Sequence, residues 1–294
     1  MKLIDFYNQA VRFGRSADPR RDKQGITSFQ DSAILFGKLD TEIKKIMVGI
    51  DIEVAELLLA DRLRSKEGLD LVVAHHPEGR AYTGLHEVMR LQVDLLKQAG
   101  VAYKTASRLL EERMQEVERR VLSQNHTRPV DAARLLNLPF MNLHTPADNH
   151  VYRFLDKLFK QRSTTPLLVK DVVKILKTIP EYQIADRFGA GPRIILGNAK
   201  RSVGKILLEM TGGTEGSKDV FGRLYKAGVR TLVSMHLSEE HFKKVKDANL
   251  NVVIAGHISS DTLGLNLLLD NIERSAKEQF SVVACSGFTR IKRG

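Results

Sequence analysis

Short apolar runs rich in β-branched residues alternate along the chain with stretches in which apolar residues recur at helical spacing. Runs of about four to eight such residues are typical of buried parallel strands, and the helical spacing indicates amphipathic helices. We expect strands at 32–37, 45–51, 69–74, 205–208, 231–236, 251–257 and 280–285. We expect helices at 1–14, 53–66, 106–124, 151–165, 166–179 and about 262–277, a polar linker at 163–165 and a loop at 186–193. This alternation predicts an α/β fold with mostly parallel sheets.

The unit at 45–76 recurs further along the chain. A shift of 160 residues takes Lys45 to Lys205 and His76 to His236, and it aligns strand, helix, glycine turn, strand and terminal histidine in the same order. Repetition of a whole supersecondary unit indicates two related α/β domains. We expect these domains to face a shared metal-binding cleft.

The expected domain boundaries follow from this repeat. The first α/β domain is assigned to 1–150, connecting helices and a loop to 151–200, and the second α/β repeat, packed against the first, to 201–294. A helical insertion at about 104–137 interrupts the first domain. Its long helix carries an apolar seam that covers a core or meets a partner chain, at Leu110, Met114, Val117 and Val121.

Composition narrows the classes of protein. With 294 residues, 43% of them apolar, the chain can bury a sizeable core. No apolar run approaches the roughly 20 residues that span a bilayer, and no signal-peptide stretch opens the chain, so we expect a cytoplasmic protein without membrane contact. Cys285 is the single cysteine, which rules out an internal disulfide and a zinc site of paired cysteines. Any metal must be held by His, Asp and Glu.

The formal net charge of +11 leaves two interpretations open. A basic surface can bind nucleic acid, or it can attract phosphorylated small molecules. The lysines and arginines are spread over many expected helical faces, and no compact basic and aromatic recognition motif is present. We therefore favour a phosphorylated or nucleotide-like small molecule over nucleic acid as the partner.

Five of the nine histidines stand at or just after the ends of expected strands, namely His75, His76, His144, His236 and His257. Ligands of open α/β sheets bind beyond the carboxyl ends of the strands. A single histidine there is more commonly a structural hydrogen-bonding group, but five together favour a metal site. Because neighbouring residues of an extended chain point to opposite sides, His75 and His76 could serve two ions.

Two of these histidines have a carboxylate four residues on, in the pairs His144 with Asp148 and His257 with Asp261. If either segment enters a helix, this spacing puts imidazole and carboxylate on one face, where they can chelate a divalent ion. The alternative for either aspartate is a helix N-cap. Imidazole and carboxylate ligands suit zinc, iron, manganese or nickel.

The turn Thr211-Gly212-Gly213 follows an expected strand and is expected to open a helix. Backbone N–H groups at a helix N-terminus can hold a phosphate, and glycine lets a ligand approach closely. The alternative is an ordinary tight turn between strand and helix.

Taken together, Ala74-His75-His76-Pro77, His144-xxx-Asp148, Thr211-Gly212-Gly213 and Gly256-His257-xxx-Asp261 resemble, in this order, the motifs of the NIF-three family. This family of NGG-one-interacting factor three is also described as homologues of type 2 GTP cyclohydrolase I. The resemblance covers roughly 32–103, 138–150 and 166–288. It implies two similar α/β domains, a dinuclear metal site between them and a toroidal homo-oligomer built from dimers. The metal ligands it implies are His75, His76, Asp148, His257 and Asp261, with His144 at or beside the metals.

Three positions depart from the family pattern. The family usually has glutamate where this chain has Asp261, so a bridging role requires the backbone to lie closer. Relatives tend to have an acidic residue near the position of His236. The segment Asp31-Ser32-Ala33 stands in place of an early Asp-Asn-x-Gly signature.

The function that these residues favour is a metal-dependent hydrolase, of cyclohydrolase or phosphoesterase type. Two divalent ions per chain, about 3.5–4 Å apart, would activate water for attack on a nucleotide-like or phosphorylated small molecule. We expect His144 and His236 to transfer protons or orient the substrate, since an unbound imidazole titrates near neutral pH. The alternative is a metal-stabilised interaction or regulatory protein, associated with nucleic acid and without catalysis.

Overall fold

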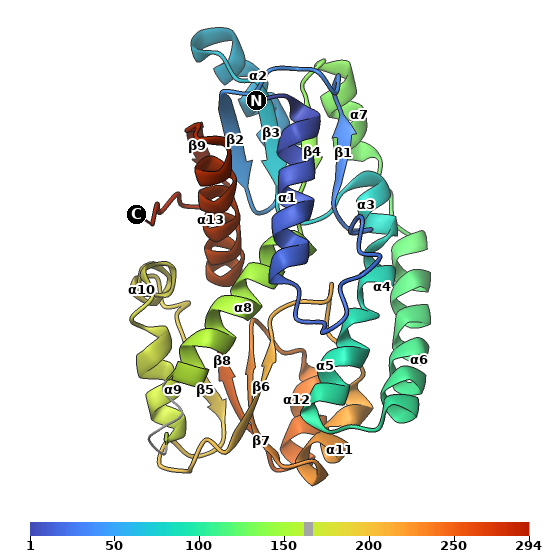
Figure 1. Ribbon diagram of the computed structural model, residues 1–294, viewed down its shortest axis with the longest axis vertical. Coiled ribbons are helices and arrows are strands. Elements are labelled where there is room, and N and C mark those ends of the chain that lie inside the picture. The colour runs from blue at the N-terminus through green and yellow to red at the C-terminus, as the bar shows by residue number, and fades with distance from the viewer. Residues whose placement is uncertain (162–166, 294) are drawn as a thin grey trace.

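The computed structural model describes residues 1–161 and 167–293, which form two lobes, one above the other in Figure 1. Each lobe is built on one sheet. The upper sheet has the strand order β1-β4-β3-β2-β9 and the lower sheet the order β5-β8-β7-β6. The linker expected at 163–165 lies outside the described residues.

The two sheets share one plan. In the upper sheet, β2 (Lys45–Gly49), β3 (Leu71–Ala74), β4 (Phe140–Asn142) and β9 (Ser281–Cys285) are parallel, and β1 (Ala33–Phe36) is an antiparallel edge strand. In the lower sheet, β6 (Lys205–Glu209), β7 (Val229–Ser234) and β8 (Asn251–Ile254) are parallel, and β5 (Arg193–Leu196) is the antiparallel edge. The α/β class with mostly parallel sheets is therefore confirmed.

The 160-residue repeat is visible in local geometry. Strands β1 and β5 are 160 residues apart, and both pairings shift register after the second residue of the strand, between Ile34 and Phe36 and between Ile194 and Leu196. Each lobe also begins its first helix in the same way, because Leu3 N–H donates to Thr41 and Val169 N–H donates to Arg201. The two lobes therefore also match in an edge strand and a helix start that the sequence repeat did not reveal.

Helices pack on both lobes. Their bounds are α1 (Leu3–Ala17), α2 (Val54–Glu67), α3 (Gly79–Thr83), α4 (Leu85–Val88), α5 (Leu91–Ala99), α6 (Tyr103–Leu122), α7 (Arg128–Leu135), α8 (Thr145–Gln161), α9 (Val169–Leu176), α10 (Pro180–Arg187), α11 (Phe221–Lys226), α12 (Glu239–Asp247) and α13 (His257–Ala276), with a short 3-10 helix at Lys218–Val220. Within this described part of the chain, no helix has the length and apolar character needed to cross a membrane.

Alternation along β2 shows how the upper sheet is buried on both faces. Ile46 and Val48 pack with α1 and α13 on one face, whereas Met47 packs with α2 and α7 on the other. Successive strand residues point to opposite faces, and a sheet covered on both sides carries continuous apolar strands. This is why the strands read as unbroken apolar runs in the sequence.

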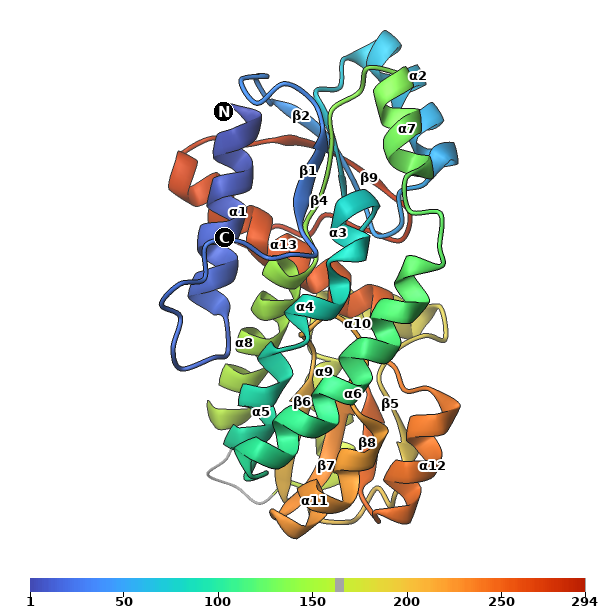
Figure 2. The same cartoon turned by 90° about the vertical axis from the view of Figure 1, so that its right-hand side faces the viewer.

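Helices α8 and α13 cross between the lobes (Figures 1 and 2). A side chain at Gly264 of α13 would meet the backbone carbonyl of Ala147 in α8 at 2.6 Å. Glycine at this crossing therefore lets the two helix backbones approach closely. The first turns of both helices face the gap between the sheets, which positions the candidate site.

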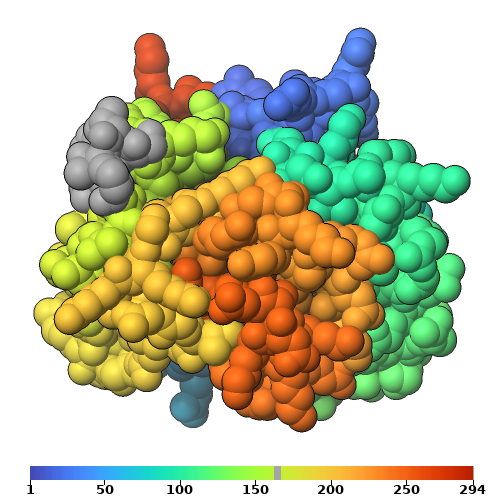
Figure 3. All heavy atoms as spheres, turned by 90° about the horizontal axis from the view of Figure 1, so that it is seen from below, coloured from blue at the N-terminus to red at the C-terminus, as the bar shows by residue number. Residues whose placement is uncertain are grey.

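The helical insertion links the lobes. Between β3 and β4 the chain forms α3 to α7, whereas the equivalent connection between β7 and β8 contains α12. The predicted seam of α6 covers a core by packing against Met89. Leu96 of α5 and Leu109 of α6 also pack in one core with Phe221 of α11 and with strands of the lower sheet, and Figure 3 shows this green segment beside the orange second half.

Several boundaries differ from those expected. Helix α8 begins at Thr145 rather than 151, and α13 begins at His257 rather than near 262. Pro180 begins helix α10 as well as following α9, so the expected loop at 186–193 starts inside a helix. Proline is favoured in a first helical turn because its missing N–H would have no partner there. Strands β4 and β5 and helices α3 to α5, α10 and α12 were not predicted.

Candidate metal centre

The predicted strand ends meet between the two lobes. His75 and His76 follow β3, and His144 stands between β4 and α8. His257 is the first residue of α13, with Asp261 one turn further on. The short parallel strands of both sheets thus direct their carboxyl ends, and the first turns of α8 and α13, at one region.

Three overlapping groups of side chains have ligand atoms that lie within 4.8 Å of one another. The groups are His75 with His76 and His144, His76 with His257 and Asp261, and His75 with Asp148 and Asp261. Buried imidazole and carboxylate groups at this spacing could hold a metal ion. The structure therefore brings together the five ligands implied by the family resemblance, together with His144.

Asp261 lies at the centre of the cluster, and its two oxygens face different histidines. Oδ1 is 3.5 Å from Nε2 of His75. Oδ2 is 3.5 Å from Nε2 of His76 and 3.6 Å from Nε2 of His257. The two oxygens of Asp261 thus face both sides of the cluster. Because α13 begins at His257, Asp261 lies within its first turns, where the shorter aspartate side chain can reach these histidines.

Asp148 faces the same atoms from helix α8. Its Oδ1 is 3.4 Å from Nε2 of His75, and its Oδ2 is 3.7 Å from Nε2 of His144. Among the described residues, His75 Nε2, Asp148 Oδ1 and both oxygens of Asp261 are buried without a hydrogen bond. Buried polar atoms normally have partners, so this convergent set of free lone pairs fits a cation.

The far nitrogen of three of the rings is held by a second group. Nδ1 of His75 is 3.1 Å from the carbonyl of Leu143. Nδ1 of His76 is 2.6 Å from Asp51, and Nδ1 of His144 is 2.8 Å from Asp31. Such partners fix the orientation and tautomer of ligating histidines, and here they direct each Nε2 atom into the cluster.

The carboxylates make this a site that favours positive charge. Burial alone would lower the pKa of His75, but Asp261 and Asp148 outweigh burial and raise that pKa to about 10. Burial would also lower the pKa of His76, but Asp261 and Asp51 outweigh burial and raise that pKa to about 9. Burial opposes ionisation of Asp261, yet the histidines hold its pKa well below its usual range. At His257, burial lowers the pKa.

His236 lies at the edge of the cluster. Its ring centroid is 4.7 Å from that of His257, and its Nδ1 is 3.5 Å from Glu215. The Glu215 carboxylate, which also accepts from Ser238 N–H, raises the pKa of His236. His236 is therefore beside the group of candidate ligands and outside the three groups themselves.

The turn at Thr211-Gly212-Gly213 does not open a helix as expected. The next helical residues are Lys218–Val220, and the turn instead contacts α5, where Gln92 donates to the carbonyls of Gly212 and Thr214. Both glycines adopt positive φ, +99° and +83°, which makes a turn that curls around Gln92. Thr211 and Gly213 nevertheless line the cavity beside the cluster.

Sequence reasoning missed the residues that orient the cluster. Asp51 follows β2, and Asp31 precedes β1, so both lie near the strand edge where ligands gather. Glu215 and Glu209 line the cavity from the second lobe. These acids could have been noticed by their position near a strand end. None of them stands at helical spacing from a histidine, so the pattern that marked Asp148 and Asp261 does not mark them.

Other histidines lie in separate surroundings. His86 contacts Glu87 and Glu118, and His126 lies by the carbonyl of Gln124. His150 donates to the carbonyl of Pro146 within α8, and its burial lowers its pKa to about 4. His241 lies in the polar network of Glu215, outside the cluster.

The fold and site together define a two-lobed α/β protein with a buried His/Asp cluster that could hold metal. A solved NIF3 superfamily protein from Sphaerobacter thermophilus superposes with a TM-score of 0.80 and 31% sequence identity, covering 95% of this chain and 98% of that chain. This chain belongs to the NIF3 superfamily, which confirms the resemblance carried by its motifs.

More distant structures share the fold. Reduced HcgD from Methanocaldococcus jannaschii has a TM-score of 0.55 at 14% identity, with 97% of each chain covered. The protein TTHA1606 from Thermus thermophilus has a TM-score of 0.51 at 14% identity, also with 97% of each chain covered. No family model and no curated protein matched the sequence.

Proposed function

We propose that this protein is a metal-dependent hydrolase that holds two divalent ions and acts on a nucleotide-like or phosphorylated small molecule. The observation that carries the proposal is the position of Asp261, whose Oδ1 faces His75 and whose Oδ2 faces His76 and His257. A carboxylate with each oxygen among a different set of imidazoles is suited to two ions.

The overlapping groups suggest how ligands would divide. One ion would be held by His75, Asp148 and Asp261, and the other by His76, His257 and Asp261. The buried lone pairs without hydrogen bonds, on His75, Asp148 and Asp261, support this division. Zinc, iron, manganese and nickel all accept such ligands.

Divalent ions bound here would polarise an electrophilic substrate and make water a stronger nucleophile at neutral pH. His144 would exchange a proton through Nε2, because Asp31 holds its Nδ1. His236, half exposed at the edge of the cavity and paired with Glu215, would donate a proton to the leaving group or orient the substrate.

The anionic part of the substrate is proposed to contact the turn at 211–213. Thr211 and Gly213 line the cavity, while Gly212 gives the turn its shape through positive φ. Glycine leaves the backbone accessible to a close ligand. This role does not depend on a helix N-terminus.

Metal analysis of protein purified without chelator tests the centre. We expect about two ions per chain in the wild type, and loss of at least one in Asp261→Asn because both groups share this residue. His126→Ala, which changes a histidine outside the cluster, is the matched control and should keep its metal. Wild-type protein that stays metal-free after incubation with zinc, manganese or iron(II) would refute the proposal.

Turnover tests the chemistry. Metal-loaded protein should release product from at least one member of a panel of nucleotides and phosphoesters, and Asp148→Asn should abolish that release. Metal that binds without any turnover would instead favour an interaction or regulatory protein. Turnover that survives Asp148→Asn would show that the reaction occurs elsewhere.

A further inference from the structure

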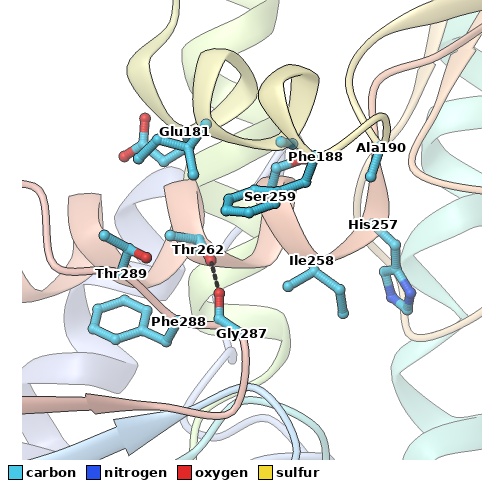
Figure 4. A pocket seen from close by; sticks show the side chains of 12 residues that line it. Glu181, Phe188, Ala190, His257, Ile258, Ser259, Thr262, Gly287, Phe288 and Thr289 are labelled. Carbon is cyan, nitrogen blue, oxygen red and sulfur yellow. Dashed lines mark hydrogen bonds between the residues drawn. The ribbon is translucent and has the colours of Figure 1, made fainter.

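A pocket of about 540 Å³ opens beside the metal centre, between α10, the start of α13 and the segment 287–289 (Figure 4). His257 is the residue that lines both this pocket and the cavity of the cluster. In Figure 4 its ring lies at one end of the pocket, with Ile258 next to it. A molecule in the pocket would therefore approach the cluster at His257.

The two spaces differ greatly in size. The cavity within the cluster offers about 40 Å³, which is room for ions or a few waters and not for a ring. The neighbouring pocket falls within the range of about 300–1,000 Å³ typical of small-molecule sites. The bulk of any substrate that reacts at the cluster must consequently lie outside it.

The pocket walls are mainly apolar. They include Ile184 from α10, Phe188 directly after it, Ile258 from α13, and Phe288. Phe188 is 83% exposed, although a phenylalanine at the surface gains from being covered. No lysine or arginine is among the described residues that line the pocket.

The polar groups of the walls already have partners within the protein. Glu181 pairs with Arg293 at 2.5 Å and accepts from Asn266. Thr262 donates to the carbonyl of Gly287. The hydroxyl of Ser259 is buried without a hydrogen bond. Such a wall suits an uncharged ring and offers little to a phosphate.

We propose that this pocket binds an aromatic or heteroaromatic ring of the substrate and directs the attached anionic group past His257 to the metal centre. This inference rests on the proposed function and specifies its substrate class as ring-bearing esters or phosphoesters. Phe188 would cover one face of the ring, where aromatic contact adds to the apolar burial.

The test compares two anions that differ in the ring alone. Zinc-loaded protein is titrated with phenylphosphonate and with methylphosphonate by calorimetry, and we expect phenylphosphonate to bind about tenfold tighter or more. Ala185→Phe, which fills the pocket from α10, should remove the difference, and Phe188→Ala should reduce it. Leu135→Ala, which truncates an exposed leucine on α7, is the control and should leave it unchanged. Equal binding of both anions to the wild type would overturn the pocket's role and leave the proposed function standing.

A second measurement separates the pocket from the metals. Benzyl alcohol is followed by saturation-transfer NMR on the metal-free protein, where it should bind to the wild type and be excluded by Ala185→Phe. If neither phosphonate binds but benzyl alcohol behaves in this way, the ring site is supported and the proposed function fails. Absent or unaltered benzyl alcohol binding would overturn the ring site. A lower oligomeric mass of Phe188→Ala in light scattering, with the preference for phenylphosphonate intact, would also overturn the ring site. Phe188 would then cover a second copy of the chain.

Discussion

Asp51 and His76 are joined by a 2.6 Å contact between Oδ1 and Nδ1, while Nε2 of the same ring lies 3.5 Å from Asp261. The ring thus stands between an exposed carboxylate and a buried one. Strand β2 ends at Gly49 and brings Asp51 to the edge where β3 delivers His76. The contact fixes which nitrogen of His76 can face a metal.

Replacing Asp51 with asparagine should weaken metal binding. The amide keeps the size of the side chain but removes the charge that orients and polarises His76, and losses at such positions are about 10–100-fold in affinity. Competition against a chromophoric chelator measures this. Asp40→Asn, an exposed aspartate of a loop in the same lobe, is the matched control. Unchanged affinity in Asp51→Asn would mean that the contact does not support a ligand.

Metal should stabilise the protein. At an ion concentration of about 100 times Kd, binding of one ion to the folded state adds about 2.7 kcal/mol, which corresponds to a rise in Tm of about 4 °C for a chain of this size. Calorimetry in zinc and then in excess chelator should show the rise and its reversal. His75→Ala, which removes a ligand of one of the two proposed ions, should show a smaller rise. A metal-induced rise of equal size in His75→Ala would place the stabilising ion outside this cluster.

The helix crossing that carries the site should tolerate no side chain at Gly264. A methyl group there would meet the carbonyl of Ala147 at 2.6 Å, and overpacking of this kind costs about 1–3 kcal/mol. We expect Gly264→Ala to lower the free energy of unfolding in urea by that amount and to weaken metal binding, because Asp148 and Asp261 lie in the two displaced turns. Gly222→Ala, with no atom within 4 Å of the added methyl, should not destabilise.

Glu215 should give an acid-dependent contribution to stability. Burial would raise its pKa, but His236 and Ser238 outweigh burial and lower the pKa from 4.5 to about 2. A carboxyl whose pKa falls on folding stabilises the protein above the unfolded value and loses that contribution as the pH drops towards the folded value. At pH 7, Glu215→Gln should therefore cost about 2–3 kcal/mol. The difference from wild type should shrink as the pH falls below 4.5.

Urea unfolding of metal-free protein at pH 7, 4.5 and 3.5 measures this difference. Glu239→Gln, an exposed residue of α12 in the same lobe, is the control and should match the wild type at each pH. A Glu215→Gln deficit that stays constant over this range would show that the charge of Glu215 is not what stabilises the second lobe.

Apolar patterning predicted several of the strands that are buried on both faces, but it missed β4, whose three residues are all buried. Strands such as β2 and β3 pack under helices on each side, so their sequences are continuous apolar runs. Edge strand β5 was not predicted because it is only partly buried, with Arg193 exposed. The first turn of α13 escaped for a different reason. His257 and Asp261 turn towards the site, so an apolar stripe begins only after them.

The candidate ligands could be found in the sequence because each follows a strand end or lies one helical turn from such a residue. Asp31 and Asp51 lie near strand ends too, but their contacts with the histidines depend on which strands are neighbours, β1 beside β4 and β2 beside β3. The sequence also overestimated the turn at Gly212. The turn was expected to open a helix, whereas its glycines shape the contact with Gln92.

The two copies of the repeat differ at the candidate metal centre. Under the 160-residue shift His76 matches His236, but His75 matches Met235, so the second copy lacks the fully buried histidine of the cluster. The second copy contributes His257 and Asp261, which complete the set of donor residues that the first copy begins. Neither half of the chain contains the full set of donors. Bound metal would consequently report that the two lobes are correctly docked, which a measurement of helix content alone would not.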